Sequence, residues 1–321
     1  MGSRLGLVAL FALGALLVPL ATVRAEDTVT VGKADAASTS FLPVDVGDKV
    51  GIFKKHGLTL KISDFTGGSK LSQAIVAGAI DVGLGAGTEM ALVAKGAPMK
   101  AVCDGLSPIP FIGIAVPYDS PVKKVDQLKG KKMGISSPGS LTDWLTKQLN
   151  QHEGWSGSDA VSAIAIGNGA AAVLAAFRTN AIDADLSVTS NIFNWEEKKE
   201  GRLLAPSSDF IGNIAASTTF ASQHFIDTNP DALKRFLAGW LETIDYLVAH
   251  KAETVKIEAE VTGYSENVMA KEYDLTASKF SRDCKFDREA LANLKRAFVD
   301  QKLVEGPPDM SKLYTEAFLP K

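Results

Sequence analysis

Short apolar runs rich in β-branched residues alternate with amphipathic stretches along the first third of the chain. Strand-like runs occupy 28–31, 58–62, 81–84 and 99–102. Helical patterns fill two of the gaps between them, at 70–77 and 89–95, and each is followed by a glycine. Strands that alternate with helices indicate βαβ units and a largely parallel sheet.

The same order of elements returns about one hundred residues later. Strand-like runs recur at 132–135, 161–166 and 183–186, with helical patterns at 141–149 and 170–177. A shift of 102 residues (134 − 32) aligns several identical residues at equivalent elements: Gly32 with Gly134, Ser38 with Ser140, Ile62 with Ile164, Gly67 with Gly169, Leu84 with Leu186, and 79–81 with 181–183. We therefore expect two lobes of similar βαβ plan.

The remaining chain is predominantly helical. A helix is expected from Asn229-Pro230 onward and another over 287–299, because apolar residues recur there at i, i+3 and i+4. We expect these helices to pack on the first lobe. The lobes would then comprise 27–112 plus 216–321 (lobe 1, discontinuous) and 113–215 (lobe 2).

The first 25 residues have the pattern of a secretory signal peptide. Arg4 precedes an apolar stretch over 5–20, and Val23-Arg24-Ala25 supplies a cleavage site. The stretch is shorter than the roughly 20 apolar residues that span a bilayer. We expect cleavage after Ala25 and a mature protein in the periplasm.

The mature chain has 321 − 25 = 296 residues, with 32 basic and 37 acidic side chains. This slightly acidic balance provides no electrostatic surface for nucleic acid. If the chain is exported, its two cysteines, Cys103 and Cys284, lie in an oxidising compartment. A disulfide and two separate buried thiols both remain open.

Four stretches resemble a known family, the periplasmic components of ABC importers for nitrate, sulfonates, taurine and thiamine precursors (NMT1/THI5-like and SsuA/TauA-like proteins). The stretches are 51–62, 66–102, 119–140 and 229–247. The resemblance implies a type II periplasmic-binding-protein fold: two α/β lobes joined by a two-stranded hinge, near 112–117 and 213–220, with the ligand cleft between them. It also implies a monomer that delivers a small sulfonate, nitrate or carboxylate anion to an ABC permease, with the ATPase on the far side of the membrane.

Ligands of open α/β lobes bind beyond the carboxyl ends of the strands, so the strand-to-helix loops are the candidate site. Their glycines allow close approach to the backbone, and their hydroxyls and amides can face a ligand near helix N-termini. The candidate residues are Ser38, Thr39, Ser40, Phe41, Gly67, Gly68, Ser69, Gly87, Thr88, Glu89, Gly139, Ser140, Leu141, Asn168, Gly169, Thr189 and Asn191. Ser69, Thr88 and Ser140 would also serve as helix N-caps without any ligand.

The charges near these loops leave the ligand class open. No arginine is present to clamp a carboxylate or sulfonate, whereas Glu89 and Asp143 lie at helix starts. Both acids complement the dipoles of their own helices, but either one facing the cleft would favour an amine or a pyrimidine. Phe41 is the better candidate for stacking, since Trp144 lies on the apolar face of its helix.

Two other functions can be compared with the sequence. Scattered histidines and the absence of a G-x-S-x-G elbow argue against an enzyme, and no cofactor or metal is predicted. Gly167-x-Gly169-x-x-Ala172 resembles a dinucleotide loop, but the lobe is short and the chain carries an export signal. The pyrimidine-synthase branch of the resembling family has a cysteine-rich motif that this chain lacks. A ligand-sensing partner of a signalling receptor remains a second role for the same fold.

Overall fold

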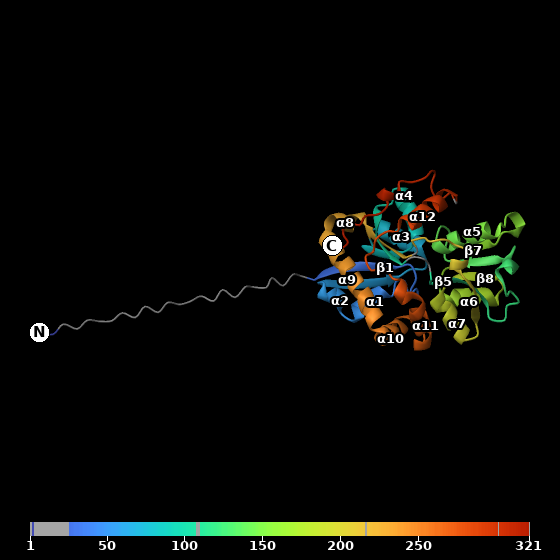
Figure 1. The fold of residues 1–321 in the computed structure, drawn as a ribbon, viewed down its shortest axis with the longest axis horizontal. Coiled ribbons are helices and arrows are strands. Elements are labelled where there is room, and N and C mark those ends of the chain that lie inside the picture. The colour runs from blue at the N-terminus through green and yellow to red at the C-terminus, as the bar shows by residue number, and fades with distance from the viewer. Residues whose placement is uncertain (1, 3–25, 107–109, 216, 301, 321) are drawn as a thin grey trace.

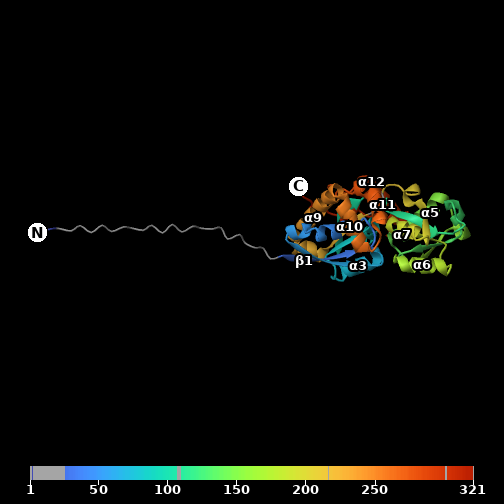
Figure 2. The same cartoon turned by 90° about the horizontal axis from the view of Figure 1, so that it is seen from below.

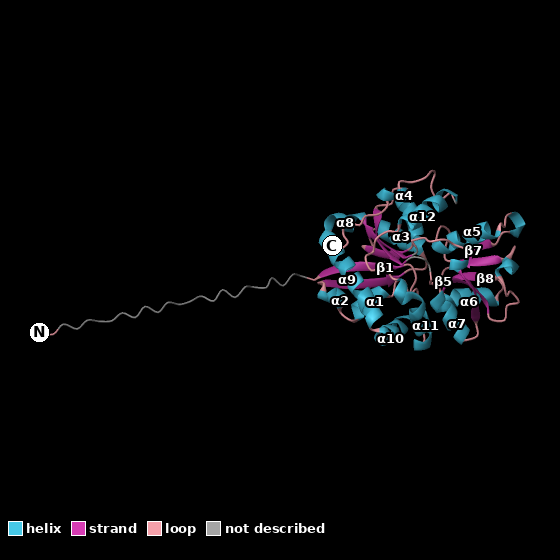
Figure 3. Cartoon of the chain, viewed as in Figure 1, coloured by secondary structure: helices cyan, strands magenta, loops and turns pink. Residues whose placement is uncertain are grey.

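The computed structural model describes residues 2, 26–106, 110–215, 217–300 and 302–320, so the predicted signal peptide lies almost wholly outside the described residues. Two five-stranded sheets lie side by side, each flanked by helices (Figures 1 and 3). The first has the order β2-β1-β3-β10-β4, with β1 (Asp27–Lys33), β2 (Leu58–Asp64), β3 (Val82–Gly85), β4 (Met99–Leu106) and β10 (Ser217–Ser222). The second has the order β7-β6-β8-β5-β9, with β5 (Ile112–Pro117), β6 (Lys132–Ile135), β7 (Ser162–Ala165), β8 (Ala184–Val188) and β9 (Gly201–Pro206).

The two sheets share one plan, as the 102-residue repeat predicts. β1, β2 and β3 take the same places in the first sheet as β6, β7 and β8 in the second. The expectation of largely parallel sheets needs a correction at one strand in each: β10 and β5 run antiparallel to both of their neighbours. Each reversed strand is the first one after the chain crosses from the other sheet.

The repeat extends to the hydrogen bonds that hold equivalent strands. An Asp81 carboxylate oxygen accepts the backbone N–H of Thr30 at 2.9 Å. At the equivalent place, Asp183 accepts the N–H of Lys132, also at 2.9 Å. The aligned Ile-Asp pairs therefore brace the first strand of each repeat.

The chain crosses between the sheets twice, between Leu106 and Ile112 and between Pro206 and Ser217. The first expected hinge segment, 112–117, is instead strand β5, hydrogen-bonded on both sides within the second sheet. The start of the first crossing lies beside the end of the second, because Ser217 of β10 pairs with Leu106 of β4.

Helices cover both sheets, and most of the C-terminal ones lie against the first (Figure 1). The exception is the helix Glu266–Thr276, which packs on the helix Thr189–Glu197 of the second half. The first repeat holds α1 (Pro43–Lys49), α2 (Ile52–Lys55), α3 (Gly68–Val76) and α4 (Met90–Ala94), and the second holds α5 (Leu141–Glu153), α6 (Ala170–Arg178) and α7 (Thr189–Glu197). The C-terminal set is α8 (Gln223–Thr228), α9 (Pro230–Ala249), α10 (Lys251–Thr262), α11 (Glu266–Thr276) and α12 (Arg288–Asp300). In Figure 2, α9 and α3 lie on opposite faces of the first sheet. Among the described helices, none has the length and hydrophobicity of a membrane span.

The C-terminal helices share a core with the first sheet. Phe236 of α9 is fully buried and stacks on Phe53 of α2, with ring centroids 5.3 Å apart. A disulfide joins Cys103 of β4 to Cys284, just before α12, which answers the question that the sequence left open. The cross-link and this shared core fix the last hundred residues to the first repeat.

Candidate functional site

A cavity of about 70 Å³ lies between the two sheets, at the carboxyl ends of β1, β3, β6 and β8. The first repeat contributes Ala34, Asp35, Ser38, Phe41, Gly67, Gly68, Gly85, Ala86 and Glu89. From the chain beyond the first crossing come Phe111, Ile112, Ser136, Ser140, Leu141, Thr142, Asn168, Leu186, Ser187, Val188 and Asn191. One water needs about 10–15 Å³ of such volume, so this cavity admits a ligand of only a few heavy atoms.

The structure brings nine of the predicted site residues to the cavity: Ser38, Phe41, Gly67, Gly68, Glu89, Ser140, Leu141, Asn168 and Asn191. Eight others do not line it: Thr39, Ser40, Ser69, Gly87, Thr88, Gly139, Gly169 and Thr189. Most of these eight make contacts within the protein. Thr39 of the first repeat and Thr189 of the second, for example, both donate to one oxygen of Glu272, at 2.7 and 2.8 Å.

Glu89 is the predicted residue with the clearest orientation toward a ligand. Its side chain is 5% exposed, and Oε2 accepts hydrogen bonds from the Ala86 N–H (3.1 Å) and the Thr88 hydroxyl (2.9 Å). Oε1 has no hydrogen-bond partner among the residues that the structure describes, and it lies against Gly68 and Gly85 of the cavity wall. Burial raises the pKa of Glu89 to about 7.

Asp35, a residue outside the predicted set, supplies the second carboxyl of the cavity. It follows β1 directly and accepts the backbone N–H groups of Ala37 (2.8 Å) and Ser38 (3.1 Å). Burial raises its pKa to about 6, although these hydrogen bonds and nearby Lys33 oppose the rise. The Lys33 ammonium is itself buried, 2.8 Å from Asp45 and 3.2 Å from Asp64, and does not line the cavity.

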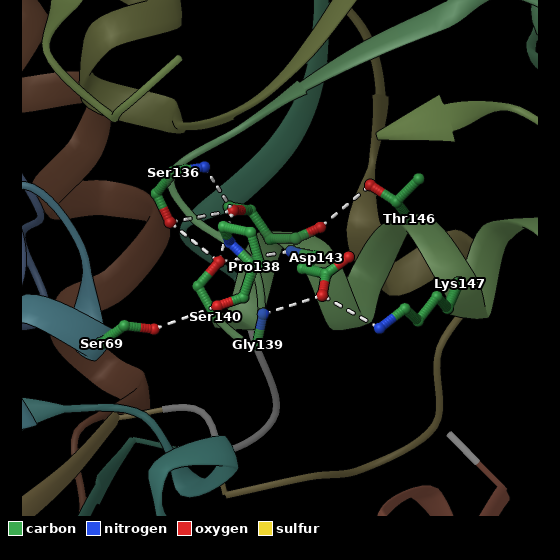
Figure 4. Close-up of polar contacts among 9 residues, drawn as sticks. Ser69, Ser136, Pro138, Gly139, Ser140, Asp143, Thr146 and Lys147 are labelled. Atoms are coloured by element: carbon green, nitrogen blue, oxygen red, sulfur yellow. Dashed lines mark hydrogen bonds and ion pairs between the residues drawn. The ribbon is translucent and has the colours of Figure 1, made fainter. Parts of the chain in front are cut away.

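The N-terminus of α5 forms the opposite wall (Figure 4). Ser140 is its N-cap and accepts the Asp143 N–H at 3.4 Å, as the sequence predicts. Asp143 does not line the cavity, and one of its oxygens lies 2.8 Å from the Gly139 nitrogen and 2.9 Å from the Lys147 ammonium (Figure 4). Of the two acids considered from the sequence, only Glu89 therefore faces the cavity.

The N-cap expectation is wrong for the other two hydroxyls. Ser69 lies inside the first turn of α3, whose N-cap is Gly67, and its hydroxyl donates to the Pro138 carbonyl at 3.2 Å (Figure 4). Thr88 lies within a short 3-10 turn and donates to Glu89 instead. Ser69 thereby links the two halves across the cavity, and Thr88 orients the carboxyl.

Direct hydrogen bonds close the halves over the cavity. Asn168 donates to Asp35 at 2.7 Å and to the Ala34 carbonyl at 3.0 Å. Ser190 donates to the Ala37 carbonyl at 2.7 Å. Together with the Ser69 contact, these bonds show a closed arrangement of the two halves.

A second, outer cavity of about 230 Å³ adjoins the first. Asp35, Asn168 and Asn191 line both, so the Asn168–Asp35 hydrogen bond lies at the boundary between them. Tyr264 lines the outer side and donates to Asn191. No group of metal-ligating side chains occurs among the described residues.

Sequence reasoning missed several lining residues for different reasons. Ser136 directly follows the predicted strand 132–135 and Asp35 lies four residues after the predicted strand 28–31, so the loop rule itself could have included them. Ser187 lies inside strand β8, where only the pairing register shows which face a side chain takes.

Among known sequences, a Brucella abortus protein named as a binding protein is 29% identical over 217 residues, 67% of this chain and 66% of its own length. The match thus spans just under two thirds of that relative. A Saccharomyces cerevisiae protein named as a 4-amino-5-hydroxymethyl-2-methylpyrimidine phosphate synthase is 26% identical over 303 residues, 87% of this chain and 84% of the yeast protein.

Solved structures show the same fold. A Bordetella bronchiseptica protein superposes with a TM-score of 0.76 at 25% identity, covering 91% of this chain and 95% of its own. The alkanesulfonate-binding protein SsuA of Xanthomonas axonopodis, bound to MOPS, gives 0.76 at 18% identity (91% and 99% covered). The periplasmic nitrate-binding protein NrtA of Synechocystis gives 0.72 at 15% (91% and 86%). The last two are, by name, binding proteins for small anions, and the fold is that of periplasmic binding proteins.

A family model described as NMT1/THI5 like matches residues 38–254, about two thirds of the sequence. The match includes every loop that lines the cavity except Ala34 and Asp35. The chain belongs to the NMT1/THI5-like family.

Proposed function

We propose that this chain is a periplasmic solute-binding protein that delivers a small molecule to the permease of an ABC importer. The observation that carries the proposal is the cavity, which lies between two sheets and is lined by strand-to-helix loops from both. Residues 27–112 with 216–321 would form one lobe and 113–215 the other. The crossings between Leu106 and Ile112 and between Pro206 and Ser217 would provide the hinge.

Two classes of ligand are candidates for this cavity. The sequence predicts a small organic or inorganic anion, and the names of SsuA and NrtA support this class by similarity. The lining of this cavity favours the second candidate, an amine- or pyrimidine-bearing ligand, because its two ionisable side chains are the carboxyls of Asp35 and Glu89.

The proposed function is binding of a solute without catalysis. The yeast relatives are named as synthases, but here both cysteines are consumed in a disulfide, and neither lines the cavity. A sensor role would use the same closure with a different partner. Loss of uptake on gene deletion supports the importer, whereas intact uptake with a lost transcriptional response supports the sensor.

The test is a binding panel on protein expressed with its leader and purified from the periplasm. Native mass spectrometry identifies any ligand that co-purifies, and thermal shifts then compare sulfonates, nitrate, carboxylates, amines and pyrimidines. A ligand at 100 times its Kd stabilises the native state by about 2.7 kcal/mol. If nothing co-purifies, nothing in the panel binds and deletion leaves uptake intact, the proposed function is wrong.

A further inference from the structure

The charge of the ligand can be argued from the two adjoining cavities, and the argument rests on the proposed binding function. Among the described residues, the inner cavity is lined by two carboxyls, Asp35 and Glu89, and by no lysine, arginine or histidine. Within the same part of the chain, the charged side chains that line the outer cavity are Asp35 and Asp64, again with no basic one. Lys33, the nearby base, is buried on Asp45 and Asp64 and does not line either space.

The Glu89 carboxyl indicates that the ligand carries a hydrogen-bond donor. Its carboxyl is held by two hydrogen bonds on Oε2, while Oε1 faces the cavity wall with no hydrogen-bond partner in the described parts of the chain. An N–H group of a ligand in the cavity would give this oxygen a hydrogen-bond partner. Gly68 makes room for this carboxyl, because a Cβ there would lie 1.5 Å from Oε1.

Asp35 provides a second acceptor further out. One of its oxygens accepts two backbone N–H groups, and the other accepts Asn168 of the opposite half at 2.7 Å. Because Asp35 lines both cavities, a ligand that reaches from Glu89 to the boundary would meet this second carboxyl. Phe41, Phe111 and Leu141 add apolar surface to the same inner lining.

We propose that the ligand is a small organic cation with N–H groups at both ends, one donating to Glu89 and the other to Asp35. The carboxylates neutralise its charge, and charge-assisted hydrogen bonds at the two ends set its length. Anionic ligands meet repulsion at both ends and find no basic side chain in either lining.

Three molecules with the same four-carbon chain test the inference by calorimetry: putrescine with two amines, butylamine with one, and butanesulfonate with an anionic end. We expect putrescine to bind about tenfold or more tightly than butylamine, because only putrescine reaches both carboxyls. Butanesulfonate should bind most weakly of the three.

Two variants link the effect to named residues. Glu89→Gln keeps the shape but removes the charge, and it should weaken putrescine binding about tenfold or more. Asp104→Asn is the matched control, since Asp104 is a buried carboxyl of the same half, with an unpartnered Oδ1, that does not line either cavity. It should change the Kd by less than about twofold. Asp35→Asn replaces Glu89→Gln if the latter fails to fold.

The outcomes separate this inference from the proposed function. Absence of amine binding, or putrescine binding that Glu89→Gln and Asp35→Asn leave unchanged, overturns the inference. If butanesulfonate or nitrate binds instead, the chain is still a solute-binding protein and only the cation assignment fails. If uptake of every panel compound survives gene deletion as well, the importer function fails with it.

Discussion

The two repeats build the same scaffold but place different chemistry on it. The 102-residue register that matches β1 to β6 and β3 to β8 also matches Glu89 to Asn191, and both residues line the cavity. The first repeat contributes both carboxyls of the lining, and the second contributes uncharged hydroxyls and amides. The charged groups of the lining therefore lie on one side of the cavity, while the other side supplies neutral hydrogen-bonding groups.

The repeats also differ in how they are held together. Only the first is joined to the C-terminal helices by a disulfide, Cys103–Cys284, which closes a loop with a sequence separation of 181 residues. Replacing both cysteines by serine should lower the free energy of unfolding by about 2–5 kcal/mol, since the unfolded chain regains the entropy of that loop. Urea denaturation measures the loss.

Selective probes show which half is affected. Trp240 lies in the cross-linked half and Trp195 in the other, so variants that keep one of them as the single tryptophan of the chain would report separately. We expect the Trp240 transition to move more than that of Trp195. Equal shifts would mean that the two halves unfold as one unit.

Gly68 and Gly169 are neighbouring positions of the repeat that should respond in opposite ways. A Cβ at Gly68 would collide with the Glu89 carboxyl, whereas a Cβ at Gly169 meets no atom within 4 Å. Gly68→Ala should therefore cost about 1–3 kcal/mol of stability and about tenfold or more in affinity. Gly169→Ala should change stability by less than about 0.5 kcal/mol.

Thermal unfolding and calorimetry of both variants give the comparison. A tolerated Gly68→Ala with unchanged affinity would mean that the Glu89 carboxyl can leave its position without consequence. The charge difference between the repeats would then not control binding.

The buried carboxyls make the ligand-free protein sensitive to pH. Burial raises the pKa of Glu89 to about 7, that of Asp185 to about 7 and that of Asp35 to about 6. Nearby Lys33 partly opposes the rise in the pKa of Asp35. The Asp35 charge in turn adds to the rise in the pKa of Asp185 and of Tyr264. The native state thus holds protons that the unfolded chain has released, so the contribution of these groups to stability is greatest below about pH 4 and is lost as the pH rises toward 8.

Each such group lowers stability by up to about 1.4 kcal/mol per pH unit across its window. We expect the Tm of ligand-free protein to be several degrees higher at pH 5.5 than at pH 8. Glu89→Gln should make the slope shallower, because it removes one of these groups. A Tm that rises with pH over this range would contradict the burial of these acids.

The sequence predicts the scaffold better than the site because the two depend on different information. The hydrophobic period is a local pattern and the 102-residue repeat is a regular one, and both can be read directly from the sequence. Strands such as 132–135 are therefore predicted correctly. The reversed strands β5 and β10 carry no such signal, since direction follows from where the chain crosses between sheets.

The side chains of the loops show the same limit. The loop rule finds Glu89 and Asn168, but it also includes Thr39 and Thr189, which have the same composition and contact Glu272 instead. That partner lies in α11, far along the chain, and no local pattern connects it to either threonine. Which hydroxyl faces a ligand is decided by these long-range contacts.

The smallest expected difference concerns the matched aspartates, where the repeats should behave most alike. Asp81 accepts both the N–H and the hydroxyl of Thr30, at 2.9 and 2.7 Å, whereas Asp183 accepts the N–H of Lys132 and forms a longer ion pair with Lys131, at 3.8 Å. Asp81→Ala should therefore cost about 1–2 kcal/mol of unfolding free energy, and Asp183→Ala about 0.5–1 kcal/mol. Urea denaturation of the two variants measures both, with affinity for the identified ligand unchanged. A larger loss at Asp183 would mean that hydrogen-bond number does not rank these braces, and a loss of affinity at either would place them in the site after all.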